Sequence, residues 1–161
     1  MIKSLGMLIL RLCVGIFLIH HGYEKLANIE NFADAFVRPL HLPFPIFLSY
    51  VAAFSEIGGS WLLITGLLTR FGALSIVMTA SFAIYHAVVF NGFNIYLLEL
   101  LGLYWGGAAA VMLCGPGKFS FDYLILSRII SEATIKIKLE KRNSYRKRLE
   151  IINSLYPKEL A

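Results

Sequence analysis

Four long apolar segments constrain the fold of this chain more than any other feature. They cover residues 5–22, 46–68, 71–90 and 95–114, and each is near the roughly 20 residues that an α-helix needs to cross the hydrocarbon of a bilayer. Because 58% of the residues are hydrophobic and the mean hydropathy is +0.70, the composition exceeds that of a soluble domain. We therefore predict an all-α integral membrane protein, a bundle of four transmembrane helices.

Ionisable side chains interrupt every one of these segments. A charge at the bilayer centre costs about 2.5–3.5 kcal/mol on insertion scales, and such residues commonly mark functional sites. They also hold helices together, because polar groups in lipid must find partners. Both interpretations stay open for the five residues: Arg11, His21, Glu56, His86 and Glu99.

The distribution of Lys and Arg predicts the topology. Positively charged segments alternate along the chain with segments of mixed or no charge. The positive segments contain Lys3, Arg70 and the basic tail after Gly117, and the others are the first loop, of mixed charge, and the uncharged turn at residues 91–94. Since positive loops stay in the cytoplasm, we expect both termini there. We expect the first helix to be retained rather than cleaved as a signal peptide, because Arg11 breaks its apolar run.

Helical rise converts sequence position into depth. At ~1.5 Å per residue, Arg11 lies ~10 Å and His21 ~25 Å from the inner end of the first helix. His86 lies ~22 Å from its inner end, and Glu99 lies ~7 Å below the outer boundary. We thus expect His21, His86 and Glu99 to share an outer layer, with Glu56 near the midplane and Arg11 below it as its deeper partner.

The outer layer combines groups that handle protons near neutral pH. An imidazole and a carboxylate at one depth can pass a proton or hydrogen-bond a carbonyl oxygen. A quinone head group suits such a site, so we assign His21, His86 and Glu99 as candidate catalytic and binding residues. Glu56 and Arg11 are further candidate binding residues or organise the bundle. Hydroxyls and amides expected at the same level are Tyr85, Asn91, Asn94 and Tyr96.

Other features point to packing rather than chemistry. Gly102 and Gly106 form a small-xxx-small step that lets two helices approach closely.

Cys13 and Cys114 are isolated, so we expect neither a disulfide nor a metal site. The first loop, residues 23–45, contains three prolines and a short stretch of helical apolar spacing; it is either a lid over the outer layer or an ordinary connector.

The tail, residues 123–161, carries the net charge of +5. An apolar stripe with Lys and Arg crowded between Lys136 and Arg148 predicts a basic amphipathic helix on the anionic cytoplasmic leaflet. Docking to a partner and simple solvation are the alternatives. We expect a membrane surface or a protein partner for this tail, and no nucleic acid.

The motifs in order along residues 5–122 resemble the DoxX family of small four-helix membrane proteins. The first two matches are Arg11-Leu12 with Gly15, and His21-Gly22 with Lys25-Leu26. The others are Glu56 with Gly58-Gly59, the turn Gly66-Leu67-Leu68-Thr69-Arg70, His86, Glu99, and Gly115-Pro116-Gly117 with Ser120 and Asp122. The resemblance implies a four-span domain at residues 1–122 and a multi-pass location in the inner membrane.

The resemblance leaves the activity open between two classes. Some relatives are small subunits of thiosulfate:quinone oxidoreductase, and others act in oxidative stress or quinone detoxification. This implies a quinone-linked oxidoreductase component; the alternative is a non-enzymatic scaffold or assembly partner. We find no Gly-rich nucleotide loop or metal-ligand motif, so the expected electron carrier is a bound quinone or a partner subunit. Self-association is also compatible with the sequence.

Overall fold

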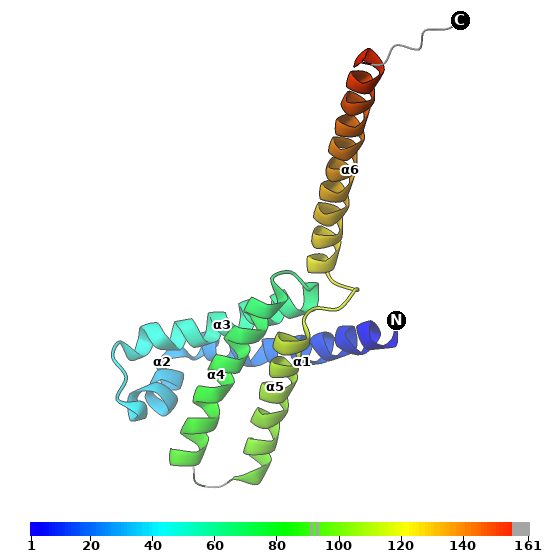
Figure 1. Ribbon diagram of the computed structural model, residues 1–161. Helices are drawn as coiled ribbons and strands as arrows, with labels where there is room; N and C mark the ends of the chain where they lie inside the picture. Colours follow the sequence, from blue (N-terminus) through cyan, green and yellow to red (C-terminus); the bar gives the residue numbers. More distant parts are fainter. Residues whose placement is uncertain (91, 93, 156–161) are drawn as a thin grey trace, which may run out of the picture. The chain divides into compact units, whose positions relative to one another are not determined.

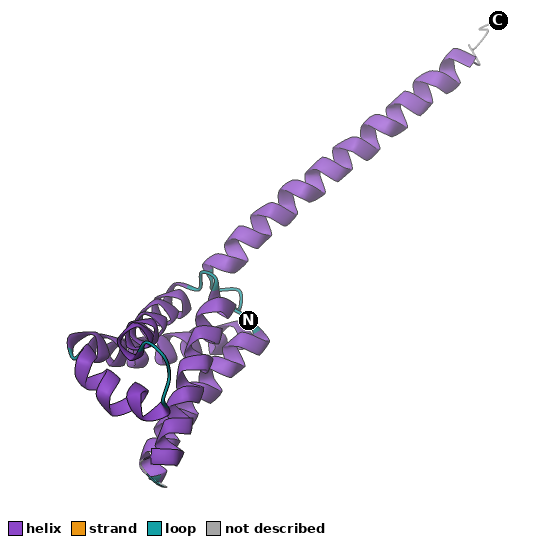
Figure 2. Cartoon of the chain, turned by 90° about the vertical axis from the view of Figure 1, so that its left-hand side faces the viewer, coloured by secondary structure: helices purple, strands orange, loops and turns teal. Residues whose placement is uncertain are grey.

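The computed structural model describes residues 1–90, 92 and 94–155, and this part of the chain is helical with no strand (Figures 1 and 2). Four helices in it are long and apolar enough to cross a membrane. They are α1 (Ile2–Ala27), α3 (Pro45–Thr65), α4 (Thr69–Phe90) and α5 (Ile95–Cys114). The predicted all-α membrane fold with four spans is confirmed.

The first helix is longer than predicted. α1 has 26 residues and continues to Ala27, so Glu24 and Lys25 belong to the span and not to the loop. Three short helical segments then connect α1 to α3, namely α2 (Ile29–Phe32), the π-helical η1 (Ala33–Val37) and the 3-10 helix η2 (Arg38–Leu40). The helical spacing in the first loop therefore predicted a real element.

Glycines allow the spans to approach closely, although not at the predicted positions. A Cβ atom on Gly59 of α3 would lie 2.9 Å from the carbonyl oxygen of Gly72 in α4, so only glycine fits that contact. By contrast, no described atom lies within 4 Å of a Cβ built on Gly102 or Gly106. The prediction that these two glycines mark a close helix contact is wrong, and the neighbouring Gly107 faces Val14 of α1 instead.

A buried guanidinium ties three segments together where α3 turns into α4. Arg11 is fully buried and donates hydrogen bonds to the carbonyl oxygens of Leu63, at 3.4 Å, and of Phe119. Gly66 makes room for it, since a Cβ there would lie 2.0 Å from Arg11 Nη1. Gly66 also ends α3 with a left-handed φ of 72°, a conformation that glycine adopts without strain. We call Arg11, Leu63, Gly66 and Phe119 the Arg11 cluster.

The segment after α5 is held at the same end of the domain by Asp122. Its carboxylate accepts hydrogen bonds from the backbone N–H groups of Leu68 (2.7 Å) and Thr69 (2.9 Å) and from the Thr69 hydroxyl (2.8 Å). These bonds cap the start of α4, where N–H groups lack helical partners. Ser120 accepts from the N–H of Tyr123 at 3.1 Å and caps α6 (Phe121–Leu155).

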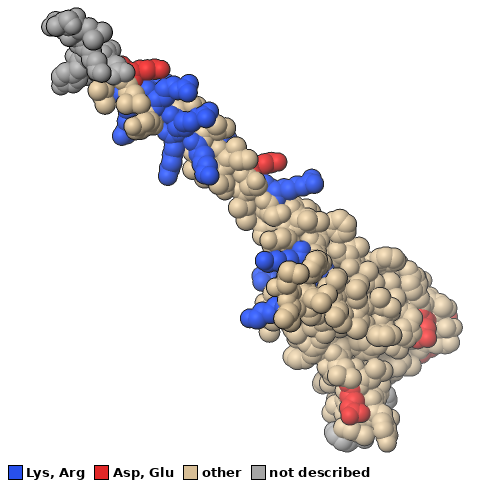
Figure 3. Space-filling model, turned by 90° about the vertical axis from the view of Figure 1, so that its right-hand side faces the viewer, with Lys and Arg blue, Asp and Glu red and all other residues tan. Residues whose placement is uncertain are grey.

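The chain divides into two compact units, which begin at Met1 and at Leu124. The first contains the four spans, and the second consists of α6 from Leu124 onward. Lys and Arg side chains gather over α6 in Figure 3, in agreement with their crowding between Lys136 and Arg148 in the sequence. A continuous basic helix is therefore present, as predicted.

Two adjacent glycines provide a matched test of the α3–α4 contact. We expect Gly59→Ala to lower the free energy of unfolding by about 1–3 kcal/mol, because the new methyl group overlaps the backbone of α4. Gly58→Ala meets no described atom within 4 Å and should be neutral or stabilising by up to about 1 kcal/mol. Unfolding temperatures in detergent check this, and equal effects at both positions would contradict the packing.

Candidate ligand site in the membrane domain

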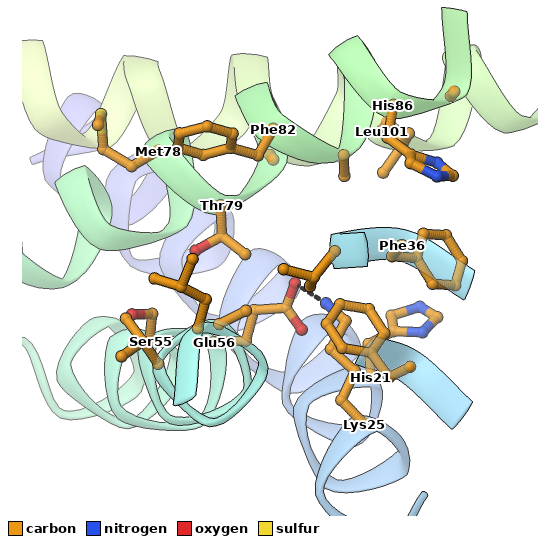
Figure 4. Close-up of a pocket in the computed structure, with 18 of the residues that line it drawn as sticks. His21, Lys25, Phe36, Ser55, Glu56, Met78, Thr79, Phe82, His86 and Leu101 are labelled. Atoms are coloured by element: carbon orange, nitrogen blue, oxygen red, sulfur yellow. Dashed lines mark hydrogen bonds and ion pairs between the residues drawn. The ribbon is translucent and has the colours of Figure 1, made fainter. Parts of the chain in front are cut away.

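A cavity of about 800 Å³ lies within the first unit, among all four spans and the segments that follow α1. Most of its lining is apolar, with a few polar groups, as in typical sites for small molecules of this size. Figure 4 shows side chains from α1, η1, α3, α4 and α5 around it. The polar lining includes His21, Lys25, Ser55, Glu56, Thr79 and His86.

A buried ion pair stands in the cavity wall between α1 and α3. Gly22 lets α1 approach α3 closely, since a Cβ there would lie 3.1 Å from the carbonyl oxygen of Ala53. Lys25, about one turn further along α1, therefore reaches Glu56 and forms an ion pair with its Oε1 atom (Figure 4). Glu56 is 5% exposed, and its other oxygen, Oε2, has no hydrogen-bond partner among the described residues.

His86 occupies another part of the wall, on α4. Its ring lies between those of Phe36 from η1 and Phe90, with centroid distances of 4.8 and 5.0 Å. The residue is 4% exposed, yet neither ring nitrogen has a hydrogen-bond partner in the described part of the chain. Since buried polar groups in native proteins are normally satisfied, these nitrogens indicate a site for a hydrogen-bonding ligand or water.

His21 lies toward the C-terminal end of α1 and is partly exposed. Its Nδ1 atom is 3.5 Å from Glu24 Oε2, and its ring centroid is 4.0 Å from that of His20, with the two rings tilted by 36°. The edge of its ring faces Tyr104 of α5 at 6.1 Å. Tyr104 donates a hydrogen bond to the carbonyl oxygen of Phe17 at 3.2 Å, and this bond links α5 to α1 beside the cavity.

Three of the five predicted site residues meet in this cavity. His21, Glu56 and His86 line it, whereas Arg11 and Glu99 are absent from the described lining. The expected association of Arg11 with Glu56 is wrong, because backbone carbonyl groups hold Arg11 and Lys25 pairs with Glu56. Glu99 does not contribute to the described lining, and unlike His86 it is not buried, since its side chain is exposed on α5. Depth along the membrane normal had not indicated which face of its helix each residue occupies.

The predicted surrounding hydroxyls and amides do not contribute to the described lining either. Tyr85 and Tyr96 are 57% and 81% exposed. Asn94 caps α5 instead, by accepting a hydrogen bond from the N–H of Leu97 at 3.4 Å. Asn91 lies outside the described residues.

Several lining residues were not predicted as site residues. Lys25 had been placed in the loop, although it follows His21 by four residues and so lies on the same helical face. Phe36 belongs to the short stretch of helical apolar spacing in the first loop, and its position against His86 depends on how that loop folds back. Nothing in the sequence marked Thr79 or Tyr104 as a site residue, because single hydroxyl groups are common in apolar helices.

The cavity has a few polar groups among its apolar lining, and it also has an exposed apolar rim. Met78, Phe82 and Leu100 line it and are also exposed, at 53%, 54% and 42%. These residues lie within α4 and α5, so in a membrane the exposed parts of their side chains face the acyl chains. A lipid-soluble molecule can thus enter sideways. Inside, it finds a carboxylate oxygen, an ammonium group and an imidazole able to bind a carbonyl or hydroxyl group.

The fold defines a small helical membrane protein with four candidate spans and a cavity among them. The DoxX family model matches residues 6–91, more than half of the chain. An uncharacterized protein from Haemophilus influenzae is 34% identical over 133 residues, which cover 76% of this chain and 85% of that relative. No solved structure matches significantly. The chain belongs to the DoxX family, as its motifs predicted.

The Lys25–Glu56 pair should contribute strongly to stability. We expect Lys25→Met to lower the free energy of unfolding by roughly 3 kcal/mol, because it leaves a buried carboxylate unpaired. Adding Glu56→Leu should restore most of that loss, since the apolar pair needs no partner. Unfolding temperatures in detergent measure both effects.

The exposed ion pair between Asp34 and Arg38, at 2.6 Å, is the control for this experiment. Asp34→Asn should cost less than about 1 kcal/mol, because solvent screens an exposed pair. If Asp34→Asn and Lys25→Met were equally harmful, burial would not explain the effect.

Proposed function

We propose that this protein binds the head group of a membrane quinone in the cavity and acts as the membrane component of a quinone-linked oxidoreductase system in the inner membrane. The observation that carries the proposal is the pair of unsatisfied groups inside the cavity. His86 and Glu56 are 4% and 5% exposed, and both ring nitrogens of His86 and the Oε2 atom of Glu56 lack partners among the described residues. A quinone has a carbonyl oxygen at each of two ends of a flat apolar ring, and these oxygens match the unsatisfied groups of His86 and Glu56.

The residues of the cavity have complementary roles in this proposal. His86 donates an N–H group to one quinone oxygen, while Phe36 and Phe90 pack against the imidazole. Lys25 and Glu56 face the other oxygen, and Glu56 Oε2 accepts a hydrogen bond from the hydroxyl of the reduced form. Reduction of a quinone to a hydroquinone consumes two electrons and two protons; a partner subunit supplies the electrons, and His86 with the Lys25–Glu56 pair transfers protons.

The state of these polar groups favours ligand binding over a purely structural role. Polar side chains that only hold helices together bond to each other or to the backbone, as Arg11 does through its Nη1 and Nη2 atoms. His86 bonds to no described group through its nitrogens. The rim of Met78, Phe82 and Leu100 further supports a ligand that arrives from the bilayer.

Quinone binding is the direct test. In nanodiscs, the full-length protein should bind a short-tailed ubiquinone analogue. His86→Leu should weaken the affinity for this analogue about tenfold or more, because it removes a buried hydrogen-bonding group whose partner is the ligand alone. Glu99→Gln should leave the affinity unchanged, since Glu99 lies outside the described lining. Equilibrium binding of radiolabelled analogue gives the affinities. Absence of binding, or equal losses in both variants, would reject the proposal.

We also propose that both termini face the cytoplasm. The Arg11 cluster and Asp122 hold residues 66–69 and 119–122 together at one end of the domain. The basic residues Lys3 and Arg70 belong to this end. Acidic residues, among them Glu24, occur near the opposite end, so the positive-inside rule supports this orientation.

Reporter fusions test the orientation. Green fluorescent protein fused after residue 161 should fluoresce, because it folds in the cytoplasm, whereas alkaline phosphatase at the same place should be inactive. Phosphatase inserted between His41 and Leu42, in the loop at the opposite end, should be active. Expression of every fusion is checked by immunoblot. The reverse activity pattern would invert the orientation.

A further inference from the structure

We propose that His20, His21 and Glu24, at the outer end of α1, bind a divalent transition metal ion of the zinc type. One ligand atom from each of the three side chains lies within 4.8 Å of the others. The proposal goes beyond quinone binding, because His20 and the imidazole-carboxylate cluster have no part in the contacts assigned to the quinone head group. We call these three residues the HHE cluster.

The local geometry suits a shared ion. Glu24 follows His20 by four residues and His21 by three, so the helical spacing makes each histidine a neighbour of Glu24. Their present contacts are already short, with His21 Nδ1 3.5 Å from Glu24 Oε2 and the two imidazole centroids 4.0 Å apart. Ligand atoms around tetrahedral zinc lie about 3.4 Å apart, from bond lengths of about 2.0–2.1 Å. Rotations of exposed side chains are sufficient to close the set.

The chemistry of the donors favours zinc-like ions over calcium or magnesium. Two imidazoles and one carboxylate suit borderline transition metals, whereas hard cations require sets of oxygen atoms. The nearest cation along the helix, Lys25, is already paired with Glu56, so much of its charge is neutralised. The carboxylate of Glu24 offsets part of the charge of the ion.

The position on α1 makes the cluster accessible from water. The helix has 26 residues and is therefore about 39 Å long, whereas the hydrocarbon is about 30 Å thick. Its outer turns reach the interfacial region, where His20 and Glu24 are exposed. An ion can arrive from the aqueous side without crossing lipid.

The HHE cluster also adjoins the cavity. His21 and Glu24 are part of its lining, and three protein ligands leave a fourth coordination position on zinc, as in catalytic sites. Water or an oxygen atom of a bound molecule completes the coordination there. The metal would thus place a Lewis acid at the mouth of the cavity, without displacing the Lys25–Glu56 pair.

Metal titration of the full-length protein in detergent, purified with a tag that contains no histidine, tests the site. Co²⁺ serves as a spectroscopic probe because its visible absorption reports tetrahedral nitrogen and oxygen coordination, and Zn²⁺ should displace it. We expect one ion per chain. His20→Ala and Glu24→Gln should each weaken binding about tenfold or more, because each removes one of three ligands. His41→Ala, which changes an exposed histidine outside the cluster, should have no effect.

Several outcomes would overturn the proposal. These are no Co²⁺ or Zn²⁺ binding below about 1 mM, unchanged affinity in both His20→Ala and Glu24→Gln, or an equal loss in His41→Ala. Unfolding temperatures show that the variants remain folded, and the isosteric Glu24→Gln protects against a simple packing defect. Quinone binding is measured in parallel: His86→Leu should weaken it about tenfold or more and retain the metal, so failure of one proposal is distinguishable from failure of the other.

Discussion

The burial of Arg11 is the constraint on which the arrangement of the membrane domain depends. Hydrocarbon offers no hydrogen-bond partner, so a guanidinium in a span must find its acceptors inside the protein. It finds them in the carbonyl oxygens of Leu63 and Phe119, which belong to segments far apart in the sequence. This requirement brings the start of α1, the end of α3 and the segment after α5 together, and Asp122 then caps α4 from the same place.

The same constraint acts differently around the cavity. Glu56 is half satisfied by Lys25, and the ring nitrogens of His86 are not satisfied by any described residue. At one end of the bundle, Arg11 bonds to the backbone through its Nη1 and Nη2 atoms, whereas toward the other end polar groups face an apolar cavity. The groups that support the fold are therefore different from those proposed to bind a ligand. The proposed quinone site and the HHE cluster both lie in this second region, and each uses groups that the packing of the helices leaves available.

The family and the class of fold were predictable because they depend on local properties. Apolar length gave four spans, and the motifs around Arg11, Glu56 and Gly66 were sufficient for the DoxX family. Depth counting assigned His21 and His86 to one layer, and both line the same cavity. It failed for Glu99, because depth along the membrane normal does not say which face of a helix a residue occupies.

By itself, the sequence determined the helical membrane class, the approximate spans and the presence of ionisable residues within them, since hydropathy and helix length are properties of continuous segments. Only the tertiary structure decided the partners. Lys25 reaches Glu56 because Gly22 lets α1 approach α3, and Phe36 meets His86 because the first loop folds back over α4. Such pairings depend on helix rotation and close approach, and these are set by contacts between segments that no local pattern contains.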